Sequence, residues 1–501
     1  MTAAMPAGRV DRWAASGALA AGLEIAARSS GLTFIAVPAP VAGAAAIVDA
    51  LRDQPRVAWT SGELTLVGVG CARELRGTGV DRWAEIVRAA RAVETAGAVI
   101  AGELAPIAAL RALGGLGAQP RWIGGAAFAP GAADRAPWLG FGDAWFVLPR
   151  WTYVCDGGRA HLVLAVDARD AESAARWHDE LALHHAAFSA WVARPQPALV
   201  ELQRASAAEW RDQVVAITDA IAGGRCSKIV AARTCTIALA GAVHAADLLA
   251  ALDHRHADCV RVLVQPPNAG ALVAATPERL VRRDGDVVRC DALAGTRSIA
   301  APADEPAAAR DRIVAAASAE LMASTKDRRE HELVVDAIRA ALADWADVEA
   351  PSEPDVRTLR HVVHLHTPFH ARLREPRHIL ELAARLHPTP AVGGTPRELA
   401  ADWIRSREPV ARGWYAAPVG WFDLDGNGEL AVAIRSGVLA GNRAHLWAGA
   451  GIVAGSDPDR ELAETELKFR AMLGALGVTA EPEAVDRGGE RPERPERSED
   501  A

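Results

Sequence analysis

Apolar and polar residues alternate most regularly in the second half of the chain, from about residue 202 onward. The segment EWRDQVVAITDAIAGG repeats apolar residues at helical spacing, and the glycine pair that ends it is typical of a helix C-terminus. Short runs of Val, Ile, Leu and Ala follow, separated by turn residues such as Asp284 and Gly285. The pattern predicts antiparallel strands, among them KIVAARTCTIAL, HVVHLHT and a closing meander over residues 420–453. We expect a last helix from about Pro458 to Leu476.

Strands and helices in this mixed order predict an α+β fold and not a doubly wound parallel sheet. The first 200 residues combine short apolar strands with helices rich in Ala and Arg, and the prolines in residues 194–200 indicate a boundary. The end of the chain repeats Glu, Arg and Pro with almost no apolar residues, which predicts a disordered tail. We therefore divide the chain into an N-terminal part (1–200), a main region (201–478) and a tail (479–501).

The composition is that of a protein with a large core, since half of the 501 residues are apolar and 24% are charged. Lys and Arg number 55 against 63 Asp and Glu, so no basic face for nucleic acid or an anionic membrane is expected. No segment approaches the ~20 consecutive apolar residues of a membrane span, and we expect no signal peptide. Six scattered cysteines without a CxxC pair indicate reduced thiols and a cytoplasmic location.

The last helix carries charged residues beside its apolar face. Glu461, Glu464 and Lys468 fall at i, i+3 and i+7 and share one side of the helix. Two interpretations stay open. The carboxylates form a solvated first turn that pairs with Lys468, or they bind Mg²⁺, because two carboxylates one turn apart suit a hard cation.

Three further charged residues stand in apolar surroundings. Glu330 extends the apolar stripe of the helix KDRREHELVVDAIRAALADW, so it either binds a metal ion or reaches solvent at the helix end. Lys228 opens a strand of Ile, Val and Ala, and is either a surface lysine or, in an apolar pocket, a general base. Glu278 follows a Thr-Pro pair at a strand end, where it could close the strand or serve as an acid.

Histidines and glycines add two weaker signals. His361, His364, His366 and His370 invite a zinc interpretation, but no further ligand at zinc spacing lies nearby, which favours one histidine as a hydrogen-bonding partner of a substrate. Glycine clusters at 293–297, 391–394 and 448–453 do not match a nucleotide fingerprint. They would let backbone N–H groups approach an anion such as a carboxylate.

Taken together, these segments resemble the chorismate-utilising enzymes and, among them, the isochorismate synthases. The resemblance covers about residues 202–476 and rests on motifs in the family's order: SKIVAAR, TPERL, LAGTR, DRREHELVV, VVHLHTP, HPTPAVGGTP, RGWYAAPVGWFD, AVAIRSG and AGAGIVAGSDPDRELAETELK. It implies two stacked antiparallel sheets flanked by helices, with the active-site cleft between them. Residues 1–200 carry no such motif, and this part of the fold is variable in the family.

The resemblance also implies a Mg²⁺-dependent, reversible isomerisation of chorismate to isochorismate. In the implied mechanism Lys228 is the base that activates water and Glu278 is the acid, while Glu330, Glu461 and Glu464 hold the Mg²⁺. The implied substrate contacts are Gly295, Thr296, His364, Ala391, Tyr415, Arg435, Gly449, Gly451 and Lys468.

Single positions separate the branches of the family. Anthranilate synthases lack the lysine at position 228 and work with a glutaminase, so no glutaminase subunit is expected here. Ala294 stands where aminodeoxychorismate synthases often have a lysine, and Ala391 favours isochorismate as the product over salicylate. A salicylate synthase and a non-catalytic chorismate-binding protein stay open as alternatives, as do a menaquinone or a siderophore pathway. We expect a monomer or a weak oligomer.

Overall fold

The computed structural model describes residues 12–50, 55–100, 102–113, 119–299, 306–360 and 362–478. The predicted tail at 479–501 and His361 therefore lie outside the described residues. Two large sheets form the framework, and their strands are antiparallel neighbours except for one parallel pair, β1 with β5. The predicted α+β class is confirmed.

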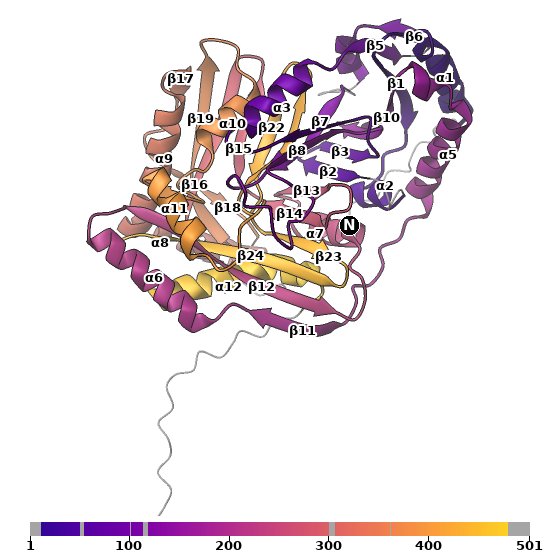
Figure 1. Ribbon diagram of the computed structural model, residues 1–501. Coiled ribbons are helices and arrows are strands. Elements are labelled where there is room, and N and C mark those ends of the chain that lie inside the picture. Colours follow the sequence, from indigo (N-terminus) through magenta and orange to yellow (C-terminus); the bar gives the residue numbers. More distant parts are fainter. Residues whose placement is uncertain are drawn as a thin grey trace, which may run out of the picture.

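The larger sheet has fourteen strands and runs through both halves of the chain (Figure 1). In spatial order it contains β11 (Leu199–Arg204), β12 (Lys228–Leu239), β24 (Arg443–Ile452), β23 (Ser436–Ala440), β14 (Ala271–Thr276), β13 (Val260–Gln265), β2 (Arg56–Ser61), β3 (Leu64–Val69), β9 (Trp151–Asp156), β10 (Arg159–Val166), β1 (Leu32–Ala39), β5 (Thr95–Ile100) and β6 (Glu103–Ala105), with β20 (Gly394–Thr395) paired to β12.

The smaller sheet has ten strands. Its order is β17 (Ala346–Glu349), β19 (Val362–Leu373), β16 (Val287–Ser298), β15 (Arg279–Asp284), β22 (Gly428–Val432), β21 (Pro418–Asp423), β7 (Arg121–Ala126), β8 (Ala144–Leu148) and β4 (Arg73–Gly77), with β18 (Asp355–Thr358) paired to β19. Strands before residue 200 thus continue both sheets, through β2 beside β13 and β7 beside β21. The division into regions stays a prediction, with the N-terminal part built into the common fold.

Helices cover the outer faces of the two sheets. They are α1 (Arg12–Ala26), α2 (Ala44–Ala50), α3 (Arg82–Arg91), the 3₁₀ helix η1 (Ile107–Leu113), α4 (Ala168–Ala171), α5 (Ala174–Ala190), α6 (Ala207–Ala222), α7 (Ala245–Arg255), α8 (Ala307–Ala323), α9 (Thr325–Leu342), α10 (Ile379–Leu386), α11 (Arg397–Arg407) and α12 (Pro458–Ala475). Among the described residues, none of these helices combines the length and the apolar character that a membrane crossing requires.

The main core lies between the two sheets. Trp59 and Trp447 of the larger sheet share it with Trp122 and Leu430 of the smaller one. A second core lies on the other face of the larger sheet, where Phe469 of α12 packs with residues of α1, α2, α5 and α7. Because β12 is covered on both faces, its side chains are buried almost throughout, which explains its continuous Ile, Val and Ala content.

Local signals fixed the helix ends much as the sequence predicted. The side chain of Asp457 accepts a hydrogen bond from the backbone of Arg460 and caps α12, whose first residue is Pro458. Helix α6 ends at Gly223, and Gly224 follows with φ +70°. The six cysteines all lie in described segments and are free thiols, as expected.

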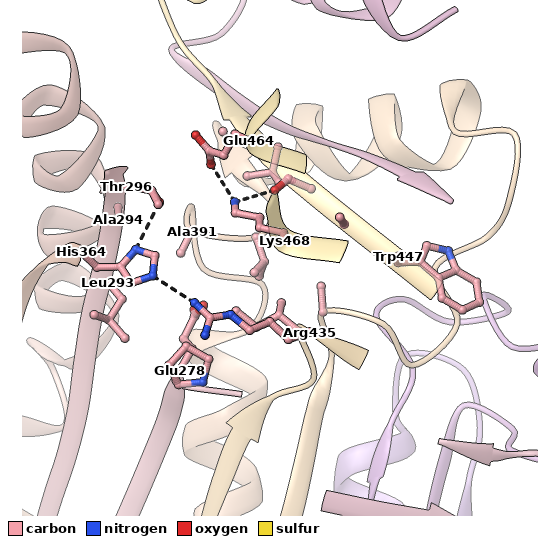
Figure 2. Close-up of a pocket in the computed structure, with 18 of the residues that line it drawn as sticks. Glu278, Leu293, Ala294, Thr296, His364, Ala391, Arg435, Trp447, Glu464 and Lys468 are labelled. Atoms are coloured by element: carbon pink, nitrogen blue, oxygen red, sulfur yellow. Dashed lines mark hydrogen bonds and ion pairs between the residues drawn. The ribbon is translucent and has the colours of Figure 1, made fainter. Parts of the chain in front are cut away.

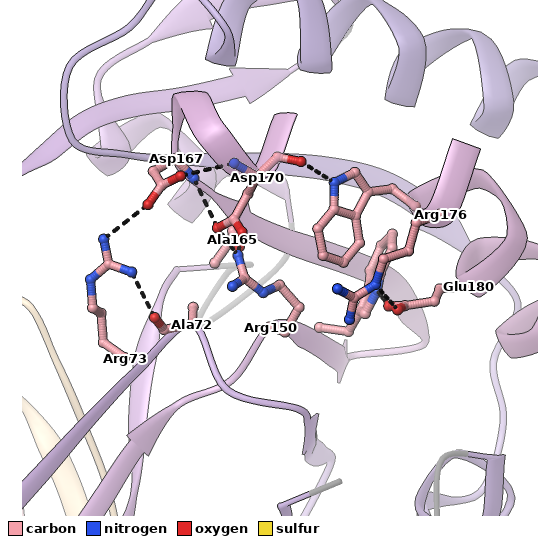
Figure 3. A network of polar contacts seen from close by, with 10 residues as sticks. Ala72, Arg73, Arg150, Ala165, Asp167, Asp170, Arg176 and Glu180 are labelled. Atoms are coloured by element: carbon pink, nitrogen blue, oxygen red, sulfur yellow. Dashed lines mark hydrogen bonds and ion pairs between the residues drawn. The ribbon is translucent and has the colours of Figure 1, made fainter. Parts of the chain in front are cut away.

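A polar network fastens α4 and α5 to the N-terminal strands (Figure 3). The Arg150 guanidinium, at the start of β9, bonds to the Asp170 carboxylate and lies 5.3 Å from the Trp177 ring centroid. Trp177 Nε1 donates to the Asp170 carbonyl at 2.6 Å, and Trp151 Nε1 donates to Glu180 at 2.8 Å. These bonds pair indole and guanidinium donors with carboxyl or carbonyl acceptors, so helix α5 is held to β9 by directional contacts as well as by apolar packing.

His184 of α5 is fully buried behind this network. Its ring lies 5.4 Å from that of Trp151, and neither ring nitrogen has a hydrogen-bond partner among the described residues. Burial lowers the pKa of His184 to about 4, so the ring is neutral in the folded protein at pH 7.

This burial predicts acid sensitivity of the N-terminal part. In the unfolded chain His184 binds a proton near pH 6.5. Above that pH its burial therefore does not lower the free energy of unfolding, and as the pH falls toward 4 up to about 3 kcal/mol of this free energy is lost. His184→Phe should therefore be more stable relative to wild type at pH 5 than at pH 7.5 in urea unfolding. The exposed His254→Phe is the matched control, and parallel pH dependences of wild type and His184→Phe would contradict the prediction.

Candidate functional site

A cavity between the sheets brings together most of the candidate site residues (Figure 2). It is lined by the predicted Glu278, Gly295, Thr296, Glu330, His364, Ala391, Tyr415, Arg435, Gly449, Gly451, Glu464 and Lys468. Strands β12 and β24 form one wall, while β16 and β19 form the other. The expected cleft between two sheets is therefore present.

Lys228 stands just behind this wall. Its side chain is completely buried, and its Nζ lies 2.8 Å from Oε1 of Glu330, so the two form an ion pair. The alternative of a surface lysine is wrong, because the first residue of β12 is covered by the neighbouring strand and by α9. Gly451 of β24 makes this possible, since a Cβ there would collide with the Glu330 carboxylate and the Lys228 stem.

Glu278 is the second buried titratable group of the cavity. It follows β14, and its backbone N–H donates to Oγ1 of Thr276 at 3.1 Å. Burial raises the pKa of Glu278 to about 7, although the nearby Lys228 and Lys468 act to lower it. A carboxyl with this pKa carries a proton for much of the time at neutral pH and can donate it, which is the property of a general acid.

Arg435 presents a guanidinium to the cavity. Its Nη2 lies 3.3 Å from Nε2 of His364, while Nδ1 of His364 lies 3.1 Å from the Gly295 carbonyl and 3.2 Å from Thr296 Oγ1. Burial lowers the pKa of His364 to about 3, so the ring is neutral and can accept from Arg435 while it donates to Gly295. The arrangement leaves a buried cation suited to a carboxylate ligand.

Tyr415 and Trp447 form an aromatic part of the cavity lining. The Tyr415 ring stacks on Trp447 with a centroid separation of 6.1 Å, and its hydroxyl is close to Gly449, where an added Cβ would lie 3.1 Å from it. Burial raises the pKa of Tyr415, so the phenol keeps its proton and is a neutral donor.

Of the two glutamates of α12 that were predicted to bind metal, Glu464 lines the cavity, whereas Glu461 lines a neighbouring pocket together with Lys326. Glu464 pairs with Lys468 at 2.8 Å, and Lys468 also donates to the Gly449 carbonyl at 2.7 Å. Glu461 is only 2% exposed and accepts from Lys326 at 2.6 Å. The solvated turn is therefore wrong for Glu461, while the expected pair of Glu464 with Lys468 is present. Burial and the charge of Glu464 raise the pKa of Glu461.

The donor set is compatible with a hard cation. Lys326 is paired with Glu461, and the charges of Glu461, Glu330 and Glu464 all act to raise the pKa of Lys326, so the three carboxylates lie near one ammonium group. Among the described residues, their oxygens do not form a group within 4.8 Å of one another, since each carboxylate is turned toward a lysine. Oxygen ligands carrying this much negative charge suit Mg²⁺.

The described histidines of β19 do not assemble a zinc site. His364 bonds within the cavity, whereas Nε2 of His366 lies 3.0 Å from Asp291. His370, near the other end of β19, lies opposite Arg289 and Glu349 in the strand register. The described histidines of this strand thus lie in separate places, and a hydrogen bond from one of them to a substrate stays a prediction.

Two important residues were missed. Lys326 was not singled out, although this chain has just three lysines, at 228, 326 and 468, among its 55 Lys and Arg residues. Each of the three pairs with one of the glutamates predicted to bind metal, so lysine scarcity was a usable signal. Arg412 was also missed; it lines the cavity fully buried, and its pairing with Glu408 at i−4 was visible in the sequence.

Comparison with known proteins agrees with this geometry. A family model described as chorismate binding enzyme matches residues 27–477. The salicylate biosynthesis isochorismate synthase of Pseudomonas aeruginosa is 38% identical over 437 residues, which cover 85% of this chain and 86% of that protein. Isochorismate synthase MenF of Bacillus subtilis is 39% identical over 271 residues, 54% of this chain and 55% of that protein.

A solved structure extends the likeness to the N-terminal part. The structure of MenF, the menaquinone-specific isochorismate synthase from Escherichia coli, matches with a TM-score of 0.72 at 27% identity and covers 92% of this chain and 100% of that one. Because the family model spans most of the chain and the Pseudomonas relative is matched over most of its length, the chain belongs to the family of chorismate binding enzymes.

Proposed function

We propose that this protein is an isochorismate synthase, an isomerase that interconverts chorismate and isochorismate. The observation that carries the proposal is one cavity that combines a lysine buried beside it, a glutamic acid with a pKa near 7 and a buried arginine. Water addition at C2 with loss of the C4 hydroxyl needs a base, an acid and a partner for the substrate's carboxylates. The names of the relatives point to the same reaction.

The residues take roles that follow from their chemistry. In its neutral form Lys228 accepts a proton from the attacking water, while Glu278 donates a proton to the departing hydroxyl; in the reverse direction the two exchange roles. General acid–base assistance of this kind contributes ~10²–10⁴-fold. Arg435 and Tyr415, with backbone N–H groups near Gly449, bind the enolpyruvyl carboxylate, and Gly295, Thr296, His364, Ala391, Gly451 and Lys468 line the remaining substrate surface.

Glu330 and Glu464 would hold Mg²⁺, with Glu461 bound directly or through water. A bound Mg²⁺ supplies positive charge for the ring carboxylate of the substrate. In the structure each of these glutamates has a lysine partner, so cation binding exchanges an ammonium partner for a metal. Lys326 is the residue most directly in competition, because all three carboxylates act on it.

The product identifies the function most directly. Purified protein incubated with chorismate and Mg²⁺ should form isochorismate up to an equilibrium mixture, measured by liquid chromatography, with pyruvate and salicylate near background. A stoichiometric yield of salicylate and pyruvate would instead make it a salicylate synthase, the alternative that Ala391 disfavours. Absence of any Mg²⁺-dependent turnover would favour a chorismate-binding protein without activity.

The acid–base pair is tested by two isosteric or near-isosteric changes. Lys228→Met and Glu278→Gln should each lower kcat by roughly 10²-fold or more while chorismate still binds, because neither group is assigned to carboxylate recognition. Arg435→Gln is the contrasting variant and should mainly raise KM. Near-normal turnover of Lys228→Met, with a native circular dichroism spectrum, would remove Lys228 from the mechanism.

Competition by Lys326 is tested by metal binding alone. Lys326→Met removes the ammonium group among three carboxylates, so Mn²⁺ should bind about tenfold more tightly, equivalent to about 1.4 kcal/mol, in calorimetry or electron paramagnetic resonance. The metal-free variant should also melt at a lower temperature than wild type, because the carboxylates then repel one another. Lys326→Arg keeps the charge and is the control. Weaker Mn²⁺ binding in Lys326→Met would show that Lys326 assists the metal site and does not compete with it.

A further inference from the structure

A second cavity, of about 670 Å³, adjoins the substrate cavity at Pro277, which lines both. The turn between β2 and β3, the segment between α7 and β13, and strands β15, β16 and β18 contribute to its lining. Four carboxylates face three guanidinium groups there, and two of those, Arg279 and Arg282, also pair with Glu429.

Three potential metal ligands gather at the edge of this cavity, directly after α7. One ligand atom each from His256, Asp258 and Cys259 lies within 4.8 Å of the other two. His256 is 5% exposed and Cys259 is 4% exposed, whereas Asp258 faces the solvent side. Imidazole, thiolate and carboxylate together are a donor set typical of zinc, and Mg²⁺ would require oxygen ligands instead.

The backbone that carries these ligands is held in place without a metal. The Cys259 N–H donates to the His256 carbonyl at 3.1 Å and closes a tight turn. The Arg261 guanidinium bonds to the carbonyls of Ala257 and Cys259, and its Nε donates to Asp253 at 2.8 Å. A ligand set fixed in this way loses little conformational freedom on binding an ion.

We propose that His256, Asp258 and Cys259 form a second metal site, which binds zinc or a similar borderline-soft divalent ion and takes water from the adjoining cavity as its fourth ligand. Binding displaces the thiol proton, which passes to the buffer, and leaves a thiolate on the metal. The charges of thiolate and carboxylate together balance those of the ion. This site is separate from the glutamates of the substrate cavity.

Arg435 links the two cavities. Its Nη1 lies 4.0 Å from the Cys259 sulfur, and its Nη2 lies 3.3 Å from His364 in the substrate cavity. A metal-bound thiolate is a stronger acceptor than a thiol, so it draws the guanidinium toward the second cavity. On the proposed function, zinc should therefore weaken chorismate binding and raise KM. Chorismate should in turn weaken zinc binding by the factor by which zinc raises the Kd of chorismate.

Cobalt provides a visible probe for this site. Chelator-treated protein with saturating Mg²⁺ is titrated with CoCl₂, and the wild type should bind one equivalent with thiolate-to-cobalt charge-transfer absorption that zinc abolishes. Cys259→Ser should lose that absorption, and His256→Gln, which keeps the thiol, should bind Co²⁺ at least about tenfold more weakly. Cys71→Ser, which removes a more accessible thiol elsewhere, is the matched control and should keep it.

The outcomes separate the site from its coupling and from the proposed function. No charge-transfer absorption in wild type, or the same absorption in Cys259→Ser, overturns the metal site. If Cys259→Ser fails to fold, undiminished Co²⁺ affinity in His256→Gln overturns it equally. Charge-transfer absorption in wild type without a zinc-dependent rise in KM supports the metal site and overturns its coupling to chorismate through Arg435. The cobalt titration reads out even if the protein does not act on chorismate.

Discussion

The buried ion pair between Arg412 and Glu408 is the interaction on which the substrate cavity depends. The two side chains are 1% and 4% exposed and join in two bonds of 2.6 and 2.8 Å. Arg412 also donates to the carbonyls of Val392 and Val230, at 2.6 and 2.8 Å, and Glu408 accepts from the backbone of Ala232 at 3.1 Å. One pair therefore holds the strand that begins at Lys228, the loop that carries Ala391 and the segment that leads to Tyr415. Removing either partner would leave an uncompensated buried charge, which costs about 3–5 kcal/mol of stability.

The same principle of paired charge organises the cavity itself. Lysine is rare in this chain, and all three copies lie against a glutamate at the site, while arginines serve the remaining basic positions. An ammonium group is a compact charge with rotatable donors, so it can leave one carboxylate for another partner, whereas a guanidinium fork is committed by its geometry. A cavity whose charged groups exchange partners when a charged substrate enters is better served by lysine. The position that holds several partners at once, 412, is occupied by an arginine.

The sequence predicted the parts of the site that are local or carried by motifs, and missed those that depend on distant partners. Helix α12 was predicted with its first residue, Pro458, and the pair of Glu464 with Lys468 follows from their spacing of four residues. Burial of Lys228 could not be read from its strand, because Glu330 lies about one hundred residues away. The sequence also could not predict which strands the first 200 residues pair with, since β2 pairs with β13 across about two hundred residues. Short apolar strands specify that a sheet forms but not which strand is next to which.

Two residues that line the substrate cavity have a strained backbone conformation. Arg435 and Ala416 have φ values of +49° and +57°, in the left-handed region that costs a residue with a Cβ roughly 1–2 kcal/mol relative to glycine. Both line the substrate cavity. Glycine at 435 would relieve the strain but would remove the guanidinium that reaches both His364 and Cys259. The unfavourable conformation at Arg435 turns the chain so that one side chain lines the substrate cavity and also lies near the Cys259 sulfur. The energy for holding it comes from the packed sheets on either side, which is why the cation has a fixed position before any ligand arrives.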